Sequence, residues 1–211
     1  MTRAIGRFLD VVRSVGAGRA SLAAAAWLAA RHYRVLTRDL GGDLPPIARP
    51  ELVFRELEPT DDERLRKMNP LLTRAEIARR RREEQRCFCC SQGDLPIHYR
   101  WYATSPVELP FLGLGFVPAS GDYTTVEAYT LPAMRGRGIH QALSIHGLHR
   151  ARGLGLRRSV SFVAWWNSPA LRAIEKLGFE HVGAVTRWTG GRVTTAGAVR
   201  MEAGSLRVEP K

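Results

Sequence analysis

The chain has 211 residues, enough for one domain of ordinary size with a short appendage. Its composition, 45% hydrophobic and 25% charged, excludes an intrinsically disordered protein. The formal net charge is +12, and nearly all of the basic residues are arginine, which is typical of a GC-rich bacterial genome. Such a charge raises the local concentration of anions, so nucleic acid, acidic lipid and a phosphorylated ligand all stay open as partners.

Two helices are predicted at the start of the chain. Residues 3–15 place apolar side chains at spacings of three and four with arginines between them, which indicates an amphipathic helix. We expect its apolar face to pack on the domain or on a second subunit of a homodimer, with peripheral contact to an acidic membrane as the alternative. A second, apolar helix is predicted to run to about Tyr33. Its longest apolar run, 21–30, is too short to span a bilayer, so we expect a cytoplasmic protein.

The stretch GGDLPPIARP is rich in turn residues and is predicted to be a linker. It separates an N-terminal helical extension with its linker, 1–50, from a single domain at 51–211. This domain starts with alternating polarity in 51–57, which predicts a strand.

Two helices are predicted next, one with Thr60 as its N-cap and one at 74–86. The second helix carries four consecutive arginines. Glutamates lie one turn from them and no aromatic residue separates them, which favours a solvated helix face over a nucleic-acid patch.

Residues 86–103 are predicted to form a hairpin that turns at Gln92-Gly93-Asp94. Its first strand carries all three cysteines of the chain, with Cys87 and Cys89 on one face and Cys90 on the other. No second cysteine cluster faces them, so we expect small core residues and no metal site. The odd number of cysteines favours a reducing compartment.

The rest of the chain alternates between strands and helices. Ser168 is predicted to cap the last helix, with Pro169 in its first position. Strands are predicted at 107–117, 124–131, 157–167, 180–188 and 192–201, and helices at 139–152 and 168–177. This order predicts an α/β fold of the α+β type, with one mixed sheet and helices on both of its faces.

The turn before the helix at 139–152 reads RGRGIHQAL and places two glycines among arginines. Gly136 and Gly138 permit close approach of a ligand, and a helix N-terminus directs backbone N–H groups at an anion. The turn lacks the Lys-Ser/Thr of a Walker A loop, and residue 141 is Gln where a dinucleotide fingerprint needs Gly. Residues 135–158 contain six arginines and no acid, which favours an anionic cofactor over a membrane.

Two motifs resemble the GCN5-related N-acetyltransferase (GNAT) superfamily. The first, YTLPAMRGRGIHQAL, matches the family loop Q/R-x-x-G-x-G/A at Arg135, Gly138 and His140. The second, NSPALRAIEKLGF, follows about thirty residues later and matches the family at Asn167, Ala170, Lys176, Gly178 and Phe179. The resemblance covers roughly residues 51–200. It implies the GNAT fold, in which the central mixed sheet is splayed between its fourth and fifth strands.

The resemblance also implies acetyl-CoA or another acyl-CoA as co-substrate, with no metal. The CoA diphosphate would lie on the backbone amides of Arg135, Gly136, Arg137, Gly138, Ile139, His140 and Gln141. The pantetheine arm would enter the splayed gap and contact Ala128, Tyr129, Thr130 and Asn167. The implied reaction is direct transfer of the acyl group to an amine, with backbone N–H groups stabilising the oxyanion.

Glu127 and Tyr129 are the candidate catalytic residues. Glu127 would take the amine proton as general base, and the alternative is a strand carboxylate that pairs with an arginine. Tyr129 alternates onto the same face and would donate a hydrogen bond there, unless it is only a half-buried strand tyrosine. Many family members carry a tyrosine that protonates the departing thiolate, but in this chain that position is Ile174.

Several aromatic and histidine side chains near these motifs have more than one interpretation. His140 stands where the family has Gly or Ala, and its ring would narrow access to the diphosphate, bond a phosphate or tilt away toward the preceding strand. Trp101 would line the acceptor pocket or pack in the core, on the same central strand as His98. We expect His146 and His149 to be structural.

These patterns predict an acyl-CoA-dependent N-acyltransferase, in the simplest case an acetyltransferase, whose acceptor is a small-molecule or peptide amine. The departures at Ile174 and His140 leave open a degenerate domain of the same fold that binds CoA or a partner without turnover. A nucleic-acid-binding module is disfavoured, because no recognition motif accompanies the basic charge.

Overall fold

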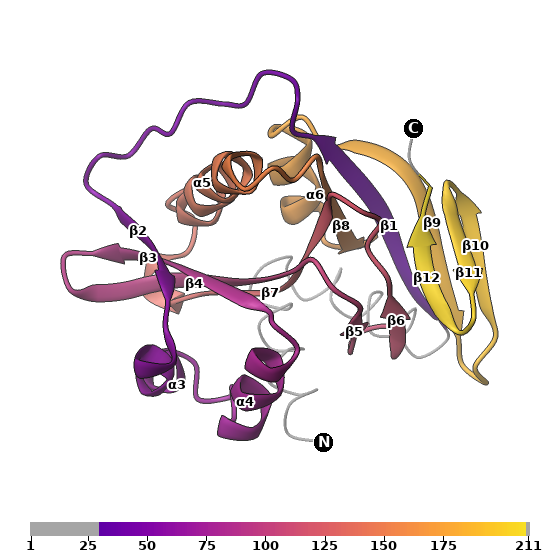
Figure 1. Cartoon of the computed structure of the whole chain (residues 1–211), viewed down its shortest axis with the longest axis horizontal. Coiled ribbons are helices and arrows are strands. Elements are labelled where there is room, and N and C mark those ends of the chain that lie inside the picture. Colours follow the sequence, from indigo (N-terminus) through magenta and orange to yellow (C-terminus); the bar gives the residue numbers. More distant parts are fainter. Residues whose placement is uncertain (1–29, 210–211) are drawn as a thin grey trace.

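The computed structural model describes residues 30–209 (Figure 1). The amphipathic helix predicted at 3–15 and most of the second helix lie outside the described residues, so the homodimer and membrane hypotheses stay predictions. Within 30–209, no helix is long and apolar enough to cross a membrane.

An eight-stranded sheet forms the centre of the described chain, in the order β10-β9-β1-β8-β7-β4-β3-β2. Only β7 and β8 are parallel neighbours, and every other adjacent pair is antiparallel. The predicted mixed sheet is therefore confirmed. Its strands are β1 (Ala30–Asp39), β2 (Val53–Leu57), β3 (Arg86–Gln92), β4 (Leu95–Ala103), β7 (Asp122–Thr130), β8 (Arg158–Ala164), β9 (Glu180–Trp188) and β10 (Val193–Gly197).

Helices cover both faces of this sheet, as predicted (Figure 1). A 3-10 turn (Pro59–Asp61), α3 (Asp62–Met68) and α4 (Arg74–Arg82) lie on one face. A second 3-10 turn (Pro132–Met134), α5 (Ile139–Gly153) and α6 (Ser168–Glu175) belong to the other. Apolar side chains from each pair of helices pack on the sheet in a separate core cluster.

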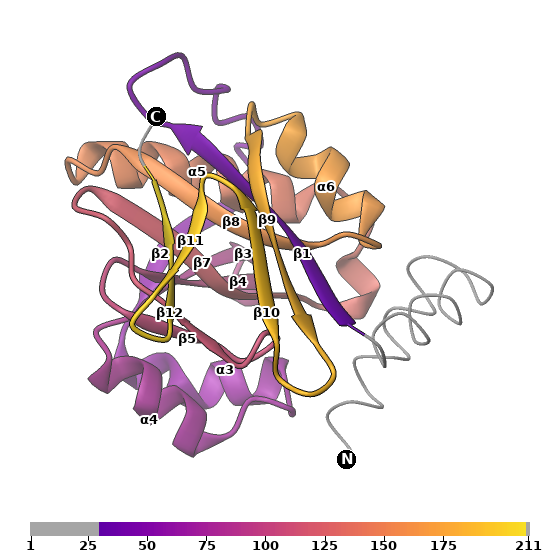
Figure 2. The same cartoon turned by 90° about the vertical axis from the view of Figure 1, so that its right-hand side faces the viewer.

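A second sheet of four short strands shares the core on the α3 and α4 face, and its order is β11-β12-β6-β5. Figure 2 shows β11 and β12 beside β9 and β10. The predicted strand at 107–117 is in fact the hairpin of this sheet, and the one at 192–201 divides at Gly197, whose φ is +67°. The strands are β5 (Val107–Leu109), β6 (Leu114–Phe116), β11 (Val199–Glu202) and β12 (Ser205–Val208).

β1 corrects the sequence prediction most strongly. Its residues pair antiparallel with β8 on one side and β9 on the other, so it lies inside the sheet. The helix predicted to run to about Tyr33 is wrong from residue 30 onward, and the boundary predicted at residue 50 does not separate an extension from the sheet. The alanine-rich stretch before residue 30 favours extending the predicted helix, but β1 itself has only one alanine, and it is fixed as a strand by pairing on two sides and by burial of Val35 and Leu36.

The helix caps also differ from the predictions. Asn167, not Ser168, caps α6, and its side-chain oxygen accepts the N–H of Ala170 at 3.3 Å. Thr60 lies within the 3-10 turn, where Glu58 and Asp61 form the capping box instead. At α4 the N-cap is Thr73, which accepts the N–H of Glu76 at 3.2 Å.

The cysteines behave as small core residues. All three are free thiols with no exposed surface. Cys87 and Cys89 join the core cluster on the α3 and α4 face, and Cys90 joins the cluster on the α5 and α6 face, as their alternation predicts. Burial raises the pKa of the Cys90 thiol to about 12, so this group is protonated at neutral pH.

The central position of β1 predicts a large loss of stability when its core residues are truncated. Leu36 is 1% exposed, so Leu36→Ala should lower the free energy of unfolding by about 2–5 kcal/mol through lost burial and a cavity. The control Ile47→Ala removes a side chain that is 49% exposed in the connection to β2, and should change it by about 0.5 kcal/mol or less. Urea denaturation measures both. Equal, small losses would mean that β1 is a dispensable extension.

Candidate functional site

The strands β7 and β8 separate soon after they begin. They pair only at Asp122 with Arg158, Tyr123 with Ser159, and Thr124 with Val160. Beyond these pairs β8 continues against β1, and β7 continues against β4. Within residues 30–209, the backbone of residues 125–130 therefore has no partner strand on its β8 side. The splay between two central strands that the GNAT resemblance implies is present here between β7 and β8.

An ion pair holds the closed end of this gap. Arg158 donates through Nε and Nη2 to the two carboxylate oxygens of Asp122, at 2.9 and 2.5 Å, from opposite positions on the two strands. Their side chains are only 13% and 6% exposed. A two-pronged arginine–carboxylate contact fixes orientation as well as distance, so it sets where the gap starts.

A bulge bends β7 where it leaves β8. Trp101 of β4 lies opposite Glu127, yet the next residue, Tyr102, lies opposite Thr125, so Val126 is an extra residue in β7. A bulge bends its strand and increases the local twist, which directs the end of β7 away from β8. The open edge, residues 125–130, includes Ala128 to Thr130, the segment predicted to bind pantetheine.

The glycine-rich loop joins this open edge to the N-terminus of α5. Gly136 and Gly138 have φ values of +76° and +73°, a region that side chains rarely adopt, and Gly138 is the N-cap of α5. A side chain at Gly136 would meet no atom within 4 Å, so the loop surface there is open. The first N–H groups of α5, from Ile139 to Gln141, have no acceptor within the helix, as at any helix N-terminus, so they are available to an anion.

Arginines tie the loop to its surroundings. Arg135 donates from Nε to the Thr130 carbonyl at 3.3 Å, and its guanidinium carbon lies 5.9 Å from the centre of the Tyr129 ring. Arg49, in the connection between β1 and β2, donates from Nη1 to the Arg137 carbonyl at 2.8 Å. Nothing local in the sequence indicates this role for Arg49, because it lies far from the loop along the chain.

Asn167 follows β8 at the same edge of the sheet as Thr130, because β7 and β8 run parallel. Its side-chain oxygen caps α6, so only its amide N–H groups are free of that bond. The structure thus places the end of β7, the loop before α5 and Asn167 at the same edge of the sheet. Their role as a cofactor site stays a prediction.

The ring of His140 turns toward the sheet. It lies edge-on to His98 of β4, with 5.3 Å between ring centres and an interplanar angle of 77°. Burial, together with the nearby Arg100 and His98, lowers the pKa of His140 well below its usual value. Of the three interpretations this geometry matches a ring that tilts away from the diphosphate position, although toward β4 rather than the preceding strand.

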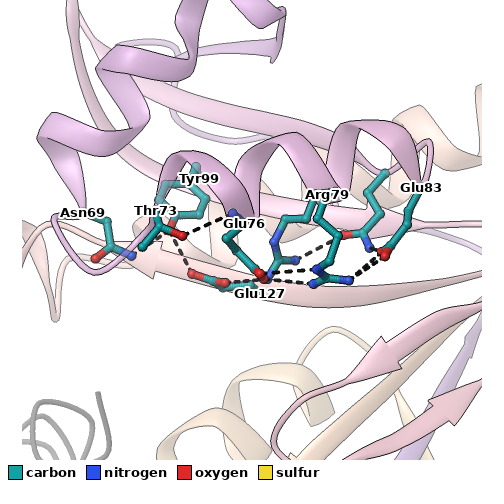
Figure 3. A network of polar contacts seen from close by, with 9 residues as sticks. Asn69, Thr73, Glu76, Arg79, Glu83, Tyr99 and Glu127 are labelled. Carbon is teal, nitrogen blue, oxygen red and sulfur yellow. Dashed lines mark hydrogen bonds and ion pairs between the residues drawn. The ribbon is translucent and has the colours of Figure 1, made fainter. Parts of the chain in front are cut away.

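Glu127 belongs to a buried polar network on the α3 and α4 face (Figure 3). Its Oε2 accepts Arg80 Nη2 at 2.7 Å, and its Oε1 accepts the Tyr99 hydroxyl at 3.0 Å. Arg80 is 2% exposed and also donates to Glu76 at 2.8 Å. The prediction of a solvated arginine face on α4 is therefore wrong for Arg80, because this side chain lies on the face of the helix that meets the sheet.

The same network fixes the protonation of Tyr99. Asn69 donates from Nδ2 to the Tyr99 oxygen at 2.8 Å, and Tyr99 donates its own hydrogen to Glu127. Burial, with the adjacent carboxylate, raises the pKa of Tyr99 far above its usual value. The ring of Tyr129 stacks on Tyr99 with 5.9 Å between centres, so Glu127 and Tyr129 share one face of β7.

The other candidate side chains are structural. Trp101 is fully buried against the Arg81 guanidinium at 5.0 Å, which supports core packing over a pocket wall. Ile174 is 4% exposed in the α6 core. His149 Nε2 contacts the Pro45 carbonyl at 2.8 Å, and His146 stacks on the Phe54 ring at 4.8 Å.

Sequence comparisons identify relatives over part of the chain. No sequence-family profile matches it. An uncharacterized N-acetyltransferase of Escherichia coli, YjgM, is 30% identical over 99 residues, which cover 45% of this chain and 59% of the relative. Mycothiol acetyltransferase of Mycobacteroides abscessus is 46% identical over 48 residues, which cover 23% of this chain and 16% of the relative. The matches thus span less than two thirds of both relatives.

Solved structures share the fold over most of the chain. A GNAT-family acetyltransferase from Novosphingobium aromaticivorans aligns with a TM-score of 0.53 and 19% identity, covering 79% of this chain and 65% of that one. A GCN5-related N-acetyltransferase from Kribbella flavida aligns with a TM-score of 0.53 and 12% identity, covering 82% and 62%. Together with the curated relatives, these neighbours support the resemblance inferred from the two sequence motifs. The chain therefore has the fold of the GCN5-related N-acetyltransferases, and part of it is similar in sequence to proteins named as N-acetyltransferases.

Proposed function

We propose that the protein is an acyl-CoA-dependent N-acyltransferase, in the simplest case an acetyltransferase. The observation that carries this proposal is the open edge of β7 beside the glycine-rich N-terminus of α5. A thioester of CoA has an extended, amide-bearing arm that suits a strand edge and a diphosphate that suits a helix N-terminus.

In this proposal the diphosphate binds the backbone amides from Arg135 to Gln141, and the pantetheine arm pairs with the edge from Ala128 to Thr130. Asn167, across the gap, donates a side-chain N–H to the arm. The exposed guanidinium groups of Arg135 and Arg137 add positive charge next to the phosphates.

The chemistry is attack of a neutral amine on the thioester carbonyl. The carbon–nitrogen bond forms, the oxyanion is stabilised by backbone N–H groups of β7, and the carbon–sulfur bond then breaks to release CoA thiolate. We assign proton removal from the amine to Glu127, directly or through water, and a hydrogen bond near the thioester to Tyr129. The thiolate leaves without a side-chain acid at Ile174, because a thiol is acidic enough to depart as its anion.

Arg80 and Tyr99 both donate hydrogen bonds to Glu127, so these contacts hold its carboxylate in place on β7. We propose a small-molecule or peptide amine as acceptor, and the cytoplasm, where buried free cysteines stay reduced, as location.

Binding and turnover together test the function. Acetyl-CoA should bind with a 1:1 stoichiometry in calorimetry, and thiol release should accelerate with at least one member of a panel of polyamines, amino sugars, amino acids and peptides. Tight CoA binding with no acceleration by any amine would favour the degenerate domain. Absence of CoA binding would contradict the proposal itself.

The loop predicts a charge-specific loss of affinity. Gly138→Asp places a carboxylate against the diphosphate position and should weaken CoA binding at least tenfold. Gly138→Asn imposes the same strain at φ +73° without the charge, so its loss should be clearly smaller. Gly153→Asp, at the far end of α5, serves as a control and should bind within twofold of the parent. If Gly138→Asp binds CoA with unchanged affinity in calorimetry, the diphosphate does not bind at this loop.

The base assignment predicts a loss of turnover over the whole pH range that is measured. Glu127→Gln removes the proton acceptor, so kcat should fall about 100-fold or more at every pH between about 6 and 9. Glu76→Gln removes the other carboxylate partner of Arg80 and controls for disruption of the network; it should retain kcat within about fivefold. An intact profile in Glu127→Gln would show that Glu127 only pairs with Arg80.

A further inference from the structure

Arg100 of β4 is a buried cation without a carboxylate partner. It is 9% exposed, and its Nη1 donates to Ser144 Oγ on α5 at 2.7 Å. Within residues 30–209 no carboxylate forms an ion pair with it, and its Nε is buried without a hydrogen-bond partner. By contrast, the buried Arg80 and the partly buried Arg158 pair with carboxylates, at 2.7 and 2.5 Å.

The groups that face Arg100 do not neutralise it. Burial, with the charge of Arg100, lowers the pKa of His98 to about 3, so this ring is neutral. His140 is neutral as well, since burial is again the main cause of its lowered pKa. The Tyr102 ring lies 5.9 Å from the guanidinium carbon and offers only a cation–π contact. Burial raises the pKa of Tyr123, which therefore stays protonated.

The space beside Arg100 holds no counter-ion. A cavity of about 10 Å³ lies against it, lined also by Ser144, Ser159 and Ile174. This volume admits about one water molecule. A guanidinium cannot lose its proton in a protein, and an unpaired buried charge strongly opposes folding. The compensating negative charge must therefore come from outside this cavity.

The N-terminus of α5 is where that charge is expected. Ser144 Oγ, which accepts Arg100, donates to the His140 carbonyl at 2.7 Å, so two hydrogen bonds connect the guanidinium to the first turn of α5. Ser144 lies five residues after Ile139, the first residue of α5, which is about 8 Å along the helix axis at a rise of ~1.5 Å per residue. At that range, through protein rather than water, charges interact appreciably.

We propose that Arg100 is an electrostatic determinant of cofactor affinity, which acts from beneath α5 on the diphosphate of the bound acyl-CoA. The inference rests on the proposed function and adds a residue from the sheet to the phosphate site. In this proposal the negative charge of the bound diphosphate compensates the positive charge of Arg100, which has no carboxylate partner within residues 30–209.

Two neutral variants test the role of the charge. Arg100→Met removes the charge and the hydrogen bond to Ser144, whereas Arg100→Gln removes the charge but still donates to Ser144. Both should weaken binding of CoA, and of dephospho-CoA, which retains the diphosphate, by about tenfold in calorimetry. Arg86→Met also lowers the net charge by one but removes an arginine that Glu56 already neutralises. It should bind CoA within twofold of the parent.

Thermal unfolding of the same proteins separates this role from a structural one. Without ligand, the melting temperature of Arg100→Met should equal or exceed that of the parent, because an unpaired buried charge has been removed. With saturating CoA the parent should gain more stability than the variant. A lower melting temperature without ligand in both variants, or CoA affinity within twofold of the parent, would overturn the inference. Failure of the parent to bind CoA would instead refute the proposed function.

Discussion

The separation of β7 from β8 after three paired residues is the constraint on which the candidate site depends. Parallel strands that stayed paired would leave no edge for a ligand, and the loop before α5 would then end on a closed sheet. The Asp122–Arg158 pair keeps the strands together at one end, and the bulge at Val126 directs them apart at the other. The β1 strand completes the arrangement, because it occupies the far side of β8 and leaves that strand free only toward the gap.

The buried arginines on the two faces of the sheet differ in their partners. On the α3 and α4 face, Arg80 pairs with two carboxylates, those of Glu127 and Glu76. On the α5 and α6 face, Arg100 has a hydroxyl partner and no acid. The paired side suits a proton-handling carboxylate that must stay in place. The unpaired side suits attraction of an anion, as we propose for Arg100.

The parts of the site that short-range patterns encode were predictable from sequence. The strand before the loop, the glycines at positive φ and the helix after them appear where turn chemistry and periodicity place them. What depends on distant pairing was not predictable. Residues 30–39 directly follow an alanine-rich stretch that favours a helix, and pairing with β8 and β9 makes them a strand. The approach of Arg49 to the loop and of Arg80 to Glu127 likewise needs the tertiary fold, since each pair is far apart in the chain.

A crystal structure of the acetyl-CoA complex tests the central claim most directly. The account predicts diphosphate oxygens on the amides of the loop and the first turn of α5, with pantetheine amides bonded to the β7 edge from Ala128 to Thr130. The thioester carbonyl would then lie on the side of the gap that carries the Glu127 and Tyr129 side chains. A cofactor bound elsewhere, or β7 and β8 paired along their whole length in the complex, would contradict the account.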